Sequence, residues 1–135
     1  MAEFKLSIVT PTGSVLDADV SEATVPGVAG EFGVFSEHQP ALMMLGGGLL
    51  SYHGSEETGT ILIRGGVAEV GPNSLLILTD HAITPESADR AEAEALLEQL
   101  SAEEAIVDAL LDDARVRRHS TTRSYAEAVI KVAGH

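Results

Sequence analysis

The chain of 135 residues has no cysteine and no tryptophan, and only 4% of its residues are aromatic. Without cysteine there are no disulfides, thiolate metal sites or cysteine nucleophiles. So few aromatic rings leave little surface on which bases or sugars can stack. Small aliphatic side chains must therefore build the core, and the apolar share of 44% is enough for a folded domain.

Basic residues and long apolar runs are also scarce. Eight Lys and Arg face 21 Asp and Glu, which gives a formal net charge of −13. This charge repels a phosphate backbone and argues against nucleic acid as a partner. The longest apolar runs, such as LLIL at 75–78, fall far short of the roughly 20 residues that span a bilayer. The N-terminus has no basic region before an apolar one, so we expect no signal peptide and a cytosolic or partner-held protein.

The period of the apolar residues changes near Thr84. Before it, Gly- and Pro-containing turn signals, among them GGG at 46–48 and GG at 65–66, separate short β-prone segments. These segments lie at 4–9, 13–20, 22–25, 48–53, 60–64, 67–70 and 74–79. Many short strands at close spacing predict an antiparallel β-sandwich over residues 1–84.

Residues 85–135 have helical composition, rich in Ala, Glu and Leu. Three quartets of apolar residues with helical spacing begin at Ala93, Val107 and Tyr125. The sequence SAEE at 101–104 fits a capping box, so we place a break at 100–104 and a second weak point at 119–122. The predicted fold class is α+β, an N-terminal antiparallel β-sandwich followed by a C-terminal antiparallel α-helical hairpin.

Charge is divided unevenly within the helical part. Residues 86–113 carry ten acidic side chains against Arg90 alone, whereas residues 115–135 carry one, Glu127. Five of the eight basic residues lie in this last stretch: Arg115, Arg117, Arg118, Arg123 and Lys131. Either the two helices pair through opposite charge, or the basic end docks on an acidic partner surface.

A search for chemistry gives negative results. The histidines have no metal-binding spacing such as H-E-x-x-H, and no nucleotide-binding or nucleophile motif occurs. Asp80 and His81 are adjacent, which would point them to opposite faces of a strand. We therefore predict no catalytic residue, no metal and no cofactor.

Three stretches in order resemble the epsilon subunit of F-type ATP synthases, called delta in mitochondria. They are VPGVAGEFGVFSEHQPALMMLGGG at 25–48, RGGVAEVGPNSLLILTD at 64–80 and ADRAEAEALL at 88–97. The likeness covers essentially the whole chain. It implies a non-catalytic rotor subunit of the central stalk, peripheral on the cytoplasmic face of the bacterial cell membrane, and held there indirectly.

The resemblance also implies partners for particular residues. The sandwich would pack on the gamma subunit and rest on the membrane ring of proton-carrying subunits, through Gly30, Glu31, Phe32, Gly33, His38 and Pro40. Glu31 matches the acidic residue that meets the ring, and His38 with Pro40 matches an element near gamma. We expect Glu31 and His38 at one end of the sandwich. The helices, with their five basic residues, would reach the alpha and beta subunits in a state that inhibits ATP hydrolysis.

The sequence departs from the family pattern at two places. Glu37 stands where the family commonly has glycine before the histidine, and Gln39 replaces a small residue. Some members bind regulatory ATP through an I/L-D-x-x-R-A motif. Arg90 and Ala91 fit its end, but Glu86 and Ser87 stand where the aliphatic residue and the Asp belong, which puts nucleotide binding in doubt.

Two other hypotheses remain beside the rotor subunit. A free-standing ligand-binding sandwich with a helical lid would have a small-molecule pocket and would melt at a higher temperature with its ligand. A small enzyme would need a titrating group in a cleft, for which His38, His53 and His81 are the candidates.

Overall fold

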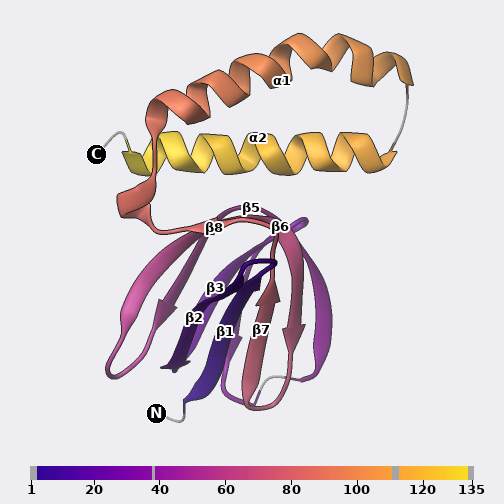
Figure 1. The fold of residues 1–135 in the computed structure, drawn as a ribbon. Helices are drawn as coiled ribbons and strands as arrows, with labels where there is room; N and C mark the ends of the chain where they lie inside the picture. The colour runs from indigo at the N-terminus through magenta and orange to yellow at the C-terminus, as the bar shows by residue number, and fades with distance from the viewer. Residues whose placement is uncertain (1–2, 38, 111–112, 134–135) are drawn as a thin grey trace.

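The computed structural model describes residues 3–37, 39–110 and 113–133, and the described side chains of the helices end at 101 and resume at 120. Strands come first and two helices last, as predicted (Figure 1). The elements are β1 (Phe4–Thr10), β2 (Gly13–Val20), β3 (Glu22–Gly27), β4 (Gly30–Phe35), β5 (Ala41–His53), β6 (Thr58–Val70), β7 (Ser74–Leu78), β8 (Ala82–Ile83), the short 3-10 helix η1 (Pro85–Ser87), α1 (Arg90–Leu110) and α2 (Asp113–Ala133).

The strands are hydrogen-bonded in the order β2-β1-β7-β6-β5-β3-β4, and β8 pairs with β6. All pairs are antiparallel except that of β1 with β7, which is parallel, with Leu6 opposite Leu75 and Ile8 opposite Ile77. The first strand thus lies beside the seventh, and this pairing brings the two ends of the sandwich sequence together.

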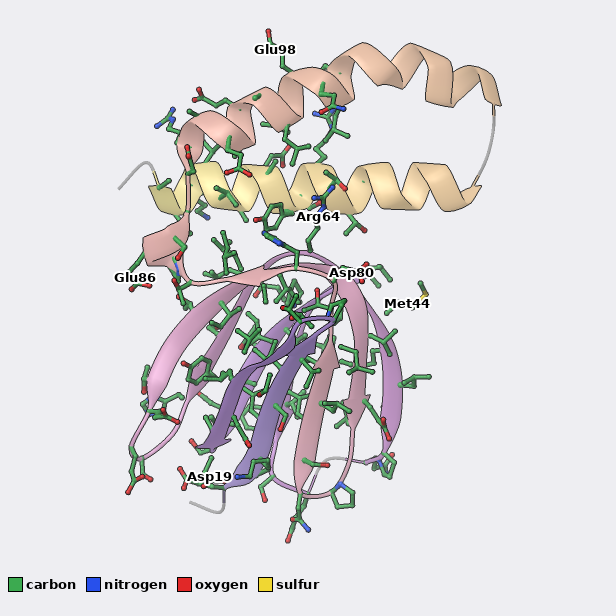
Figure 2. The ribbon with its side chains drawn as sticks, in the orientation of Figure 1. Asp19, Met44, Arg64, Asp80, Glu86 and Glu98 are labelled. Atoms are coloured by element: carbon green, nitrogen blue, oxygen red, sulfur yellow. The ribbon has the colours of Figure 1, made fainter. Side chains whose placement is uncertain are left out.

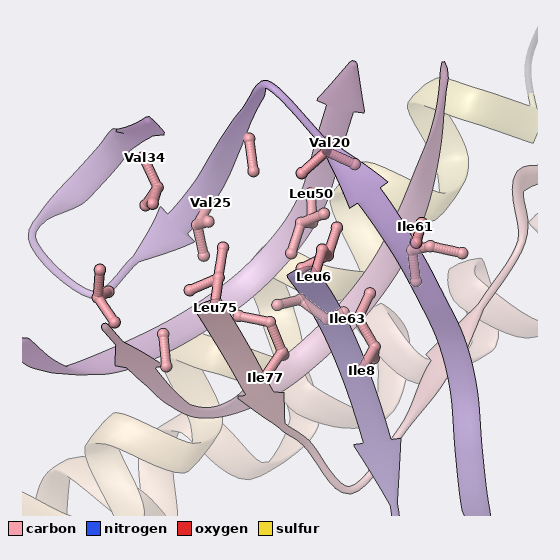
Figure 3. Close-up of a cluster of buried hydrophobic side chains, with 14 of the residues drawn as sticks. Leu6, Ile8, Val20, Val25, Val34, Leu50, Ile61, Ile63, Leu75 and Ile77 are labelled. Atoms are coloured by element: carbon pink, nitrogen blue, oxygen red, sulfur yellow. The ribbon is translucent and has the colours of Figure 1, made fainter. Parts of the chain in front are cut away.

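The core lies between the two layers and is built of aliphatic side chains (Figure 3). Alternate residues of β1 (Phe4, Leu6 and Ile8) and of β7 (Leu75 and Ile77) are buried there, as the two-residue period of a strand requires. Burying each large aliphatic side chain stabilises the fold by about 1.5–3 kcal/mol.

The glycines at 46–48 and 65–66 lie inside two long strands, so the turns predicted there are wrong. Leu45 and Leu50 of β5 both face the core although they are five residues apart, and so do Ile63 and Ala68 of β6. Strict alternation would put residues five apart on opposite faces, so both strands shift phase by one residue at the glycines. Gly65 has a φ of 78°, which glycine adopts without strain. The glycines form a corner where both strands bend.

The stretch GEFGVF at 30–35 is also a strand, β4, which the predicted β-prone segments did not include. It pairs with β3 at the edge of the sheet, with Phe32 opposite Val25. Val34 is buried in the core and Phe32 packs against it, whereas Glu31 and Phe35 are exposed. This alternation is the two-residue period of an edge strand.

Both breaks predicted within the helices are wrong, because α1 runs through 100–104 and α2 runs through 119–122. Around the first site, good helix formers on both sides favour propagation over a new cap. At the second site, Thr122 is buried, so packing overrides the low helix propensity of threonine.

Candidate partner-binding surfaces

Glu31 lies beside the turn between β3 and β4. It pairs with Pro26 in the register, and its side chain is exposed. The amide of Val28 donates to the carbonyl oxygen of Met44 at 3.1 Å, which ties the turn to the glycine corner of β5. The carboxylate is therefore presented from a fixed turn at the end of the sandwich that faces the helices.

The residues after β4 lie at the other end. The amide of Glu37 donates to the carbonyl oxygen of Pro72 at 2.8 Å, in the connection between β6 and β7. Six residues separate Glu31 from Glu37, or about 20 Å along a strand. Glu37 therefore lies at the end opposite Glu31, whereas the expectation that Glu31 and His38 share one end stays a prediction. His38 itself lies outside the described residues, and Pro40 is exposed.

Glu37 explains one departure from the family pattern. Its φ of 63° lies in the left-handed region, which glycine adopts freely and other residues adopt at a cost. The position where the family commonly has glycine therefore keeps a backbone conformation that suits glycine.

An exposed apolar surface, which the sequence analysis missed, covers the outward side of β5, β6 and β7. Two rows cross these strands in the register: Leu42, Glu69 and Leu76, and beside them Met44, Val67 and Leu78. We call these six residues the outer apolar face.

Three of its apolar members are exposed large side chains. Leu42 is 74% exposed, Met44 53% and Leu78 45%. In Figure 2, Met44 projects away from the sandwich. Large contiguous apolar patches are uncommon on free proteins and mark interaction sites. The outer apolar face is therefore the strongest candidate for a protein interface.

The helical hairpin rests on a second hydrophobic cluster, separate from the sandwich core. Its buried members are Leu62, Ala93, Tyr125, Ala126 and Val129, and Leu49 and Ile83 pack against them. Figure 1 shows α2 lying between α1 and the strands, so α2 makes the main contact with the sandwich.

Arg64 and His81 bracket Tyr125 where α2 meets the sandwich. The Arg64 guanidinium lies 5.9 Å from the centre of the Tyr125 ring, and an Arg64 amino group donates to Oγ1 of Thr122 at 3.2 Å. The His81 ring meets Tyr125 edge to face at 5.4 Å. Burial raises the pKa of the Tyr125 hydroxyl, Arg64 opposes this shift and Glu92 adds to it. The ring is thus held neutral in the docked helix.

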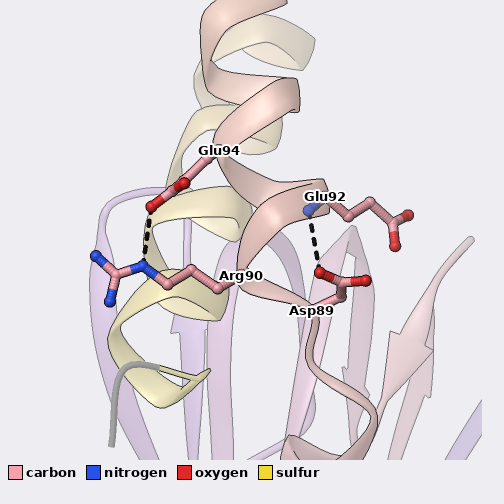
Figure 4. A network of polar contacts seen from close by, with 4 residues as sticks. All are labelled: Asp89, Arg90, Glu92 and Glu94. Carbon is pink, nitrogen blue, oxygen red and sulfur yellow. Dashed lines mark hydrogen bonds and ion pairs between the residues drawn. The ribbon is translucent and has the colours of Figure 1, made fainter.

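The start of α1 uses its polar residues locally (Figure 4). Oδ1 of Asp89 accepts from the amide of Glu92 at 3.2 Å, which caps the helix. Nε of Arg90 donates to Oε1 of Glu94 at 2.8 Å, four residues along. Arg90 and Ala91 are both exposed. Their neighbours here are helix contacts, and nucleotide binding by this pair stays untested.

The basic residues of α2 divide into two groups. Arg123 is half-buried and Lys131 is exposed. The side chains of Arg115, Arg117 and Arg118 lie outside the described residues. Their role in binding a partner stays a prediction.

The candidates for enzyme chemistry are scattered. Nδ1 of His53 lies 2.8 Å from Oγ1 of Thr58 at the exposed end of β5, whereas His81 is at the helix contact. Among residues 3–37, 39–110 and 113–133, no three His, Asp or Glu gather in a group that fits a metal ion. Of the helices in this part of the chain, none combines the length and apolarity needed to cross a membrane.

The described residues form a β-sandwich with a helical hairpin docked on it and an exposed apolar face. The family model for the ATP synthase delta/epsilon chain, beta-sandwich domain, matches residues 3–85. The chain belongs to this ATP synthase delta/epsilon family, and its resemblance to epsilon subunits is confirmed.

Relatives cover both parts of the chain. The epsilon chain of Granulibacter bethesdensis is 31% identical over 136 residues and covers 100% of both chains. That of Myxococcus xanthus is 36% identical over 127 residues, 89% of this chain and 92% of its own.

Two solved structures share the fold. A chain of the Euglena gracilis mitochondrial ATP synthase, in a structure of OSCP, F1 and the c-ring, matches with a TM-score of 0.76 at 22% identity, over 100% of this chain and 83% of its own. A chain of the Tetrahymena thermophila mitochondrial ATP synthase, in a structure of the central stalk and c-ring, matches with a TM-score of 0.60 at 16% identity, over 93% and 96%.

Proposed function

We propose that the chain is a non-catalytic central-stalk subunit of an F-type ATP synthase, which couples the membrane ring to the gamma subunit. Its family and the origin of its structural neighbours support this role. The observation that carries the proposal is the outer apolar face, because a rotor subunit without chemistry of its own acts through what it binds.

The outer apolar face is the proposed contact with gamma. Its two rows place apolar side chains side by side on three hydrogen-bonded strands, so the surface is broad and rigid. Glu69 lies on the middle strand between Leu42 and Leu76, and the half-buried Val67 and Leu76 join the exposed apolar side chains into one surface. Covering Leu42 and Met44 removes from water the apolar area that the free subunit leaves exposed.

The turn that carries Glu31 is the proposed contact with the ring, and it holds the subunit indirectly at the cytoplasmic face of the membrane. Its tie to Met44 links the two contacts: the same turn that presents Glu31 is hydrogen-bonded to a residue of the outer apolar face. Torque from the ring would thus pass to gamma through adjoining parts of one rigid sandwich.

Introducing negative charge on the outer apolar face tests the gamma contact. We expect Leu42→Glu with Met44→Glu to abolish co-purification with gamma when the two subunits are expressed together. The melting temperature of the free subunit should change little, since exposed substitutions shift stability by less than about 0.5 kcal/mol.

His53→Glu is the matched control. His53 is exposed on the same strand, eleven residues beyond Leu42 and past the glycine corner at which β5 bends. It should leave gamma binding intact. If gamma binds the double variant as tightly as the unaltered chain, the outer apolar face is not the contact.

The hairpin is the proposed regulatory element. Extended away from the sandwich, its basic residues would bind acidic surfaces of the alpha and beta subunits and slow ATP hydrolysis. Neutralising Arg115, Arg117 and Arg118 together should then raise hydrolysis by the assembled enzyme at low salt. The difference should shrink at high salt, because exposed charges are screened. Arg90→Gln, in the ion pair at the start of α1, is the control and should leave the rate unchanged.

A further inference from the structure

The attachment of the hairpin to the sandwich depends on a close approach of backbones. Gly47 of β5 and Gly65 of β6 lie one step apart on paired strands, and Thr121 of α2 lies against both. The helix therefore touches the sandwich at the glycine corner, where no side chain keeps the two backbones apart.

Gly47 is the tighter of the two positions. A Cβ atom there would overlap the carbonyl oxygen of Thr121 and come within 2.6 Å of the amide nitrogen of Tyr125. These atoms belong to the helix backbone and cannot rotate away as the end of a side chain can. The backbone of Gly47 lies outside the left-handed region, so alanine fits the strand itself and is excluded by α2 alone.

Beyond this corner, contacts of ordinary strength hold the helix. Arg64 is hydrogen-bonded to the buried Thr122 and stacks on Tyr125, and the second hydrophobic cluster packs Tyr125 and Val129 over Leu62. All of these contacts need α2 at its present height above the sheet. Moving α2 away from the sheet would lengthen all of these contacts together, because the helix moves as a rigid unit.

The sandwich does not need the helix for its own core. Among the helix residues whose side chains are described, 90–101 and 120–133, none is a buried member of the sandwich core, and the second cluster lies on the other side of β6. The hairpin is thus an attached unit whose contact with the sandwich can be lost while the strands stay packed.

We propose that the absence of a side chain at Gly47 allows α2 to dock on the sandwich, so this position, which we call the seat, sets the balance between a docked and a detached hairpin. Arg64 holds the docked helix through Thr122 and Tyr125, and we call these two contacts the clasp. The hairpin would dock or detach as one piece, since α1 is held mainly through α2.

The pair Gly47→Ala and Gly46→Ala tests the seat with hydrogen exchange on the complete chain. A Cβ atom on Gly46 would lie 3.5 Å from its nearest neighbour, the carbonyl oxygen of Gly27, which is an ordinary contact. We expect Gly47→Ala to speed amide exchange about tenfold or more in residues 90–101 and 120–133. Exchange in β1 and β7 should stay as in the unaltered chain, and Gly46→Ala should change neither region.

Two results would overturn the proposal. In one, Gly47→Ala and Gly46→Ala exchange alike in the helices. In the other, Gly47→Ala loses protection in β1 and β7 together with the helices, which would make Gly47 part of the sandwich core. Arg64→Gln provides an independent variant if Gly47→Ala fails to fold. It should speed exchange in 120–133 by a smaller factor, and unchanged exchange there would equally contradict the clasp.

The consequence for hydrolysis rests on the proposed function. A detached hairpin is free to extend, so Gly47→Ala should lower ATP hydrolysis by the assembled enzyme. If the helices detach in the isolated chain but the hydrolysis rate is unchanged, the regulatory role fails while the seat stands.

Discussion

Leu62 and Ile63 are neighbours on β6 whose side chains support different parts of the molecule. Both are fully buried, with 0% exposure. Ile63 belongs to the sandwich core, whereas Leu62 points the other way, into the cluster beneath α2. Replacing each by alanine therefore tests whether the sandwich and the docked hairpin are held by separate sets of contacts.

The two substitutions should cost similar amounts of energy in different places. Truncating a buried Leu or Ile to Ala costs about 2–5 kcal/mol, out of a total of about 5–15 kcal/mol for a protein of this kind. For Ile63→Ala, the loss falls on global unfolding and lowers the melting temperature of the strands by roughly 10 °C. For Leu62→Ala, the loss of free energy cannot exceed the free energy of docking the hairpin, because a detached hairpin no longer contacts Leu62.

Hydrogen exchange followed through a denaturant series separates the two outcomes. We expect Leu62→Ala to speed exchange in residues 90–101 and 120–133 while the global unfolding midpoint of β1 and β7 moves little. Ile63→Ala should lower that midpoint and leave unchanged the difference in exchange protection between the helices and the strands.

A shift of the strand midpoint by Leu62→Ala as large as that by Ile63→Ala would refute this reasoning. It would show that the two clusters unfold as one cooperative unit.

Three further predictions concern the boundary, the ring contact and pH. Truncation after Thr84 should leave a folded sandwich that still binds gamma, measured by circular dichroism and co-purification; an unfolded product would place the boundary elsewhere. Glu31→Lys should weaken coupling of ion flow to ATP synthesis in membrane vesicles without lowering the melting temperature, whereas a destabilised variant would make Glu31 structural. Burial raises the folded-state pKa of Tyr125, so its contribution to docking is complete below its unfolded pKa near 10 and is lost as the pH rises through the folded value. Tyr125→Phe should flatten this loss of helix protection at high pH, and an equal loss would assign it to another group.

The order of strands and helices was predictable because the two-residue and helical periods are strong over most of the chain. The prediction failed at glycines, because glycine occurs both in turns and at bends within strands. The segments at 46–48 and 65–66 read as turns, but they let β5 and β6 bend around a corner while remaining strands. Short-range propensity cannot separate these cases, because the bend is imposed by packing on both sides of the glycines.

The helix boundaries failed for a related reason. A capping box at 101–104 is a favourable local choice, yet α1 continues through it. Good helix formers on both sides favour propagation through this site, and Leu100 beside it is buried. The position of Glu31 also depends on a strand that was not predicted. Glu31 is exposed, and the length of β4 separates it from Glu37 because 30–35 is a strand.

The outer apolar face did leave a signal in the sequence. An antiparallel strand with one wet face alternates apolar and polar residues, whereas a strand covered on both faces reads as a continuous apolar run. Three solid runs occur, ALMML at 41–45, ILI at 61–63 and LLIL at 75–78. In the run at 61–63 the outward residue, Leu62, is covered by the hairpin.

In the other two runs the outward residues Leu42, Met44 and Leu78 are exposed. A continuous apolar run indicates that both faces of a strand are covered, as at Leu62. The runs at 41–45 and 75–78 therefore predict that another surface covers these exposed residues as well. The two uncovered runs lie on β5 and β7, on either side of β6, so one partner surface is enough to cover both. The proposed contact with gamma would thus account for the excess of apolar residues in β5 and β7, since the inward residues already fill the core.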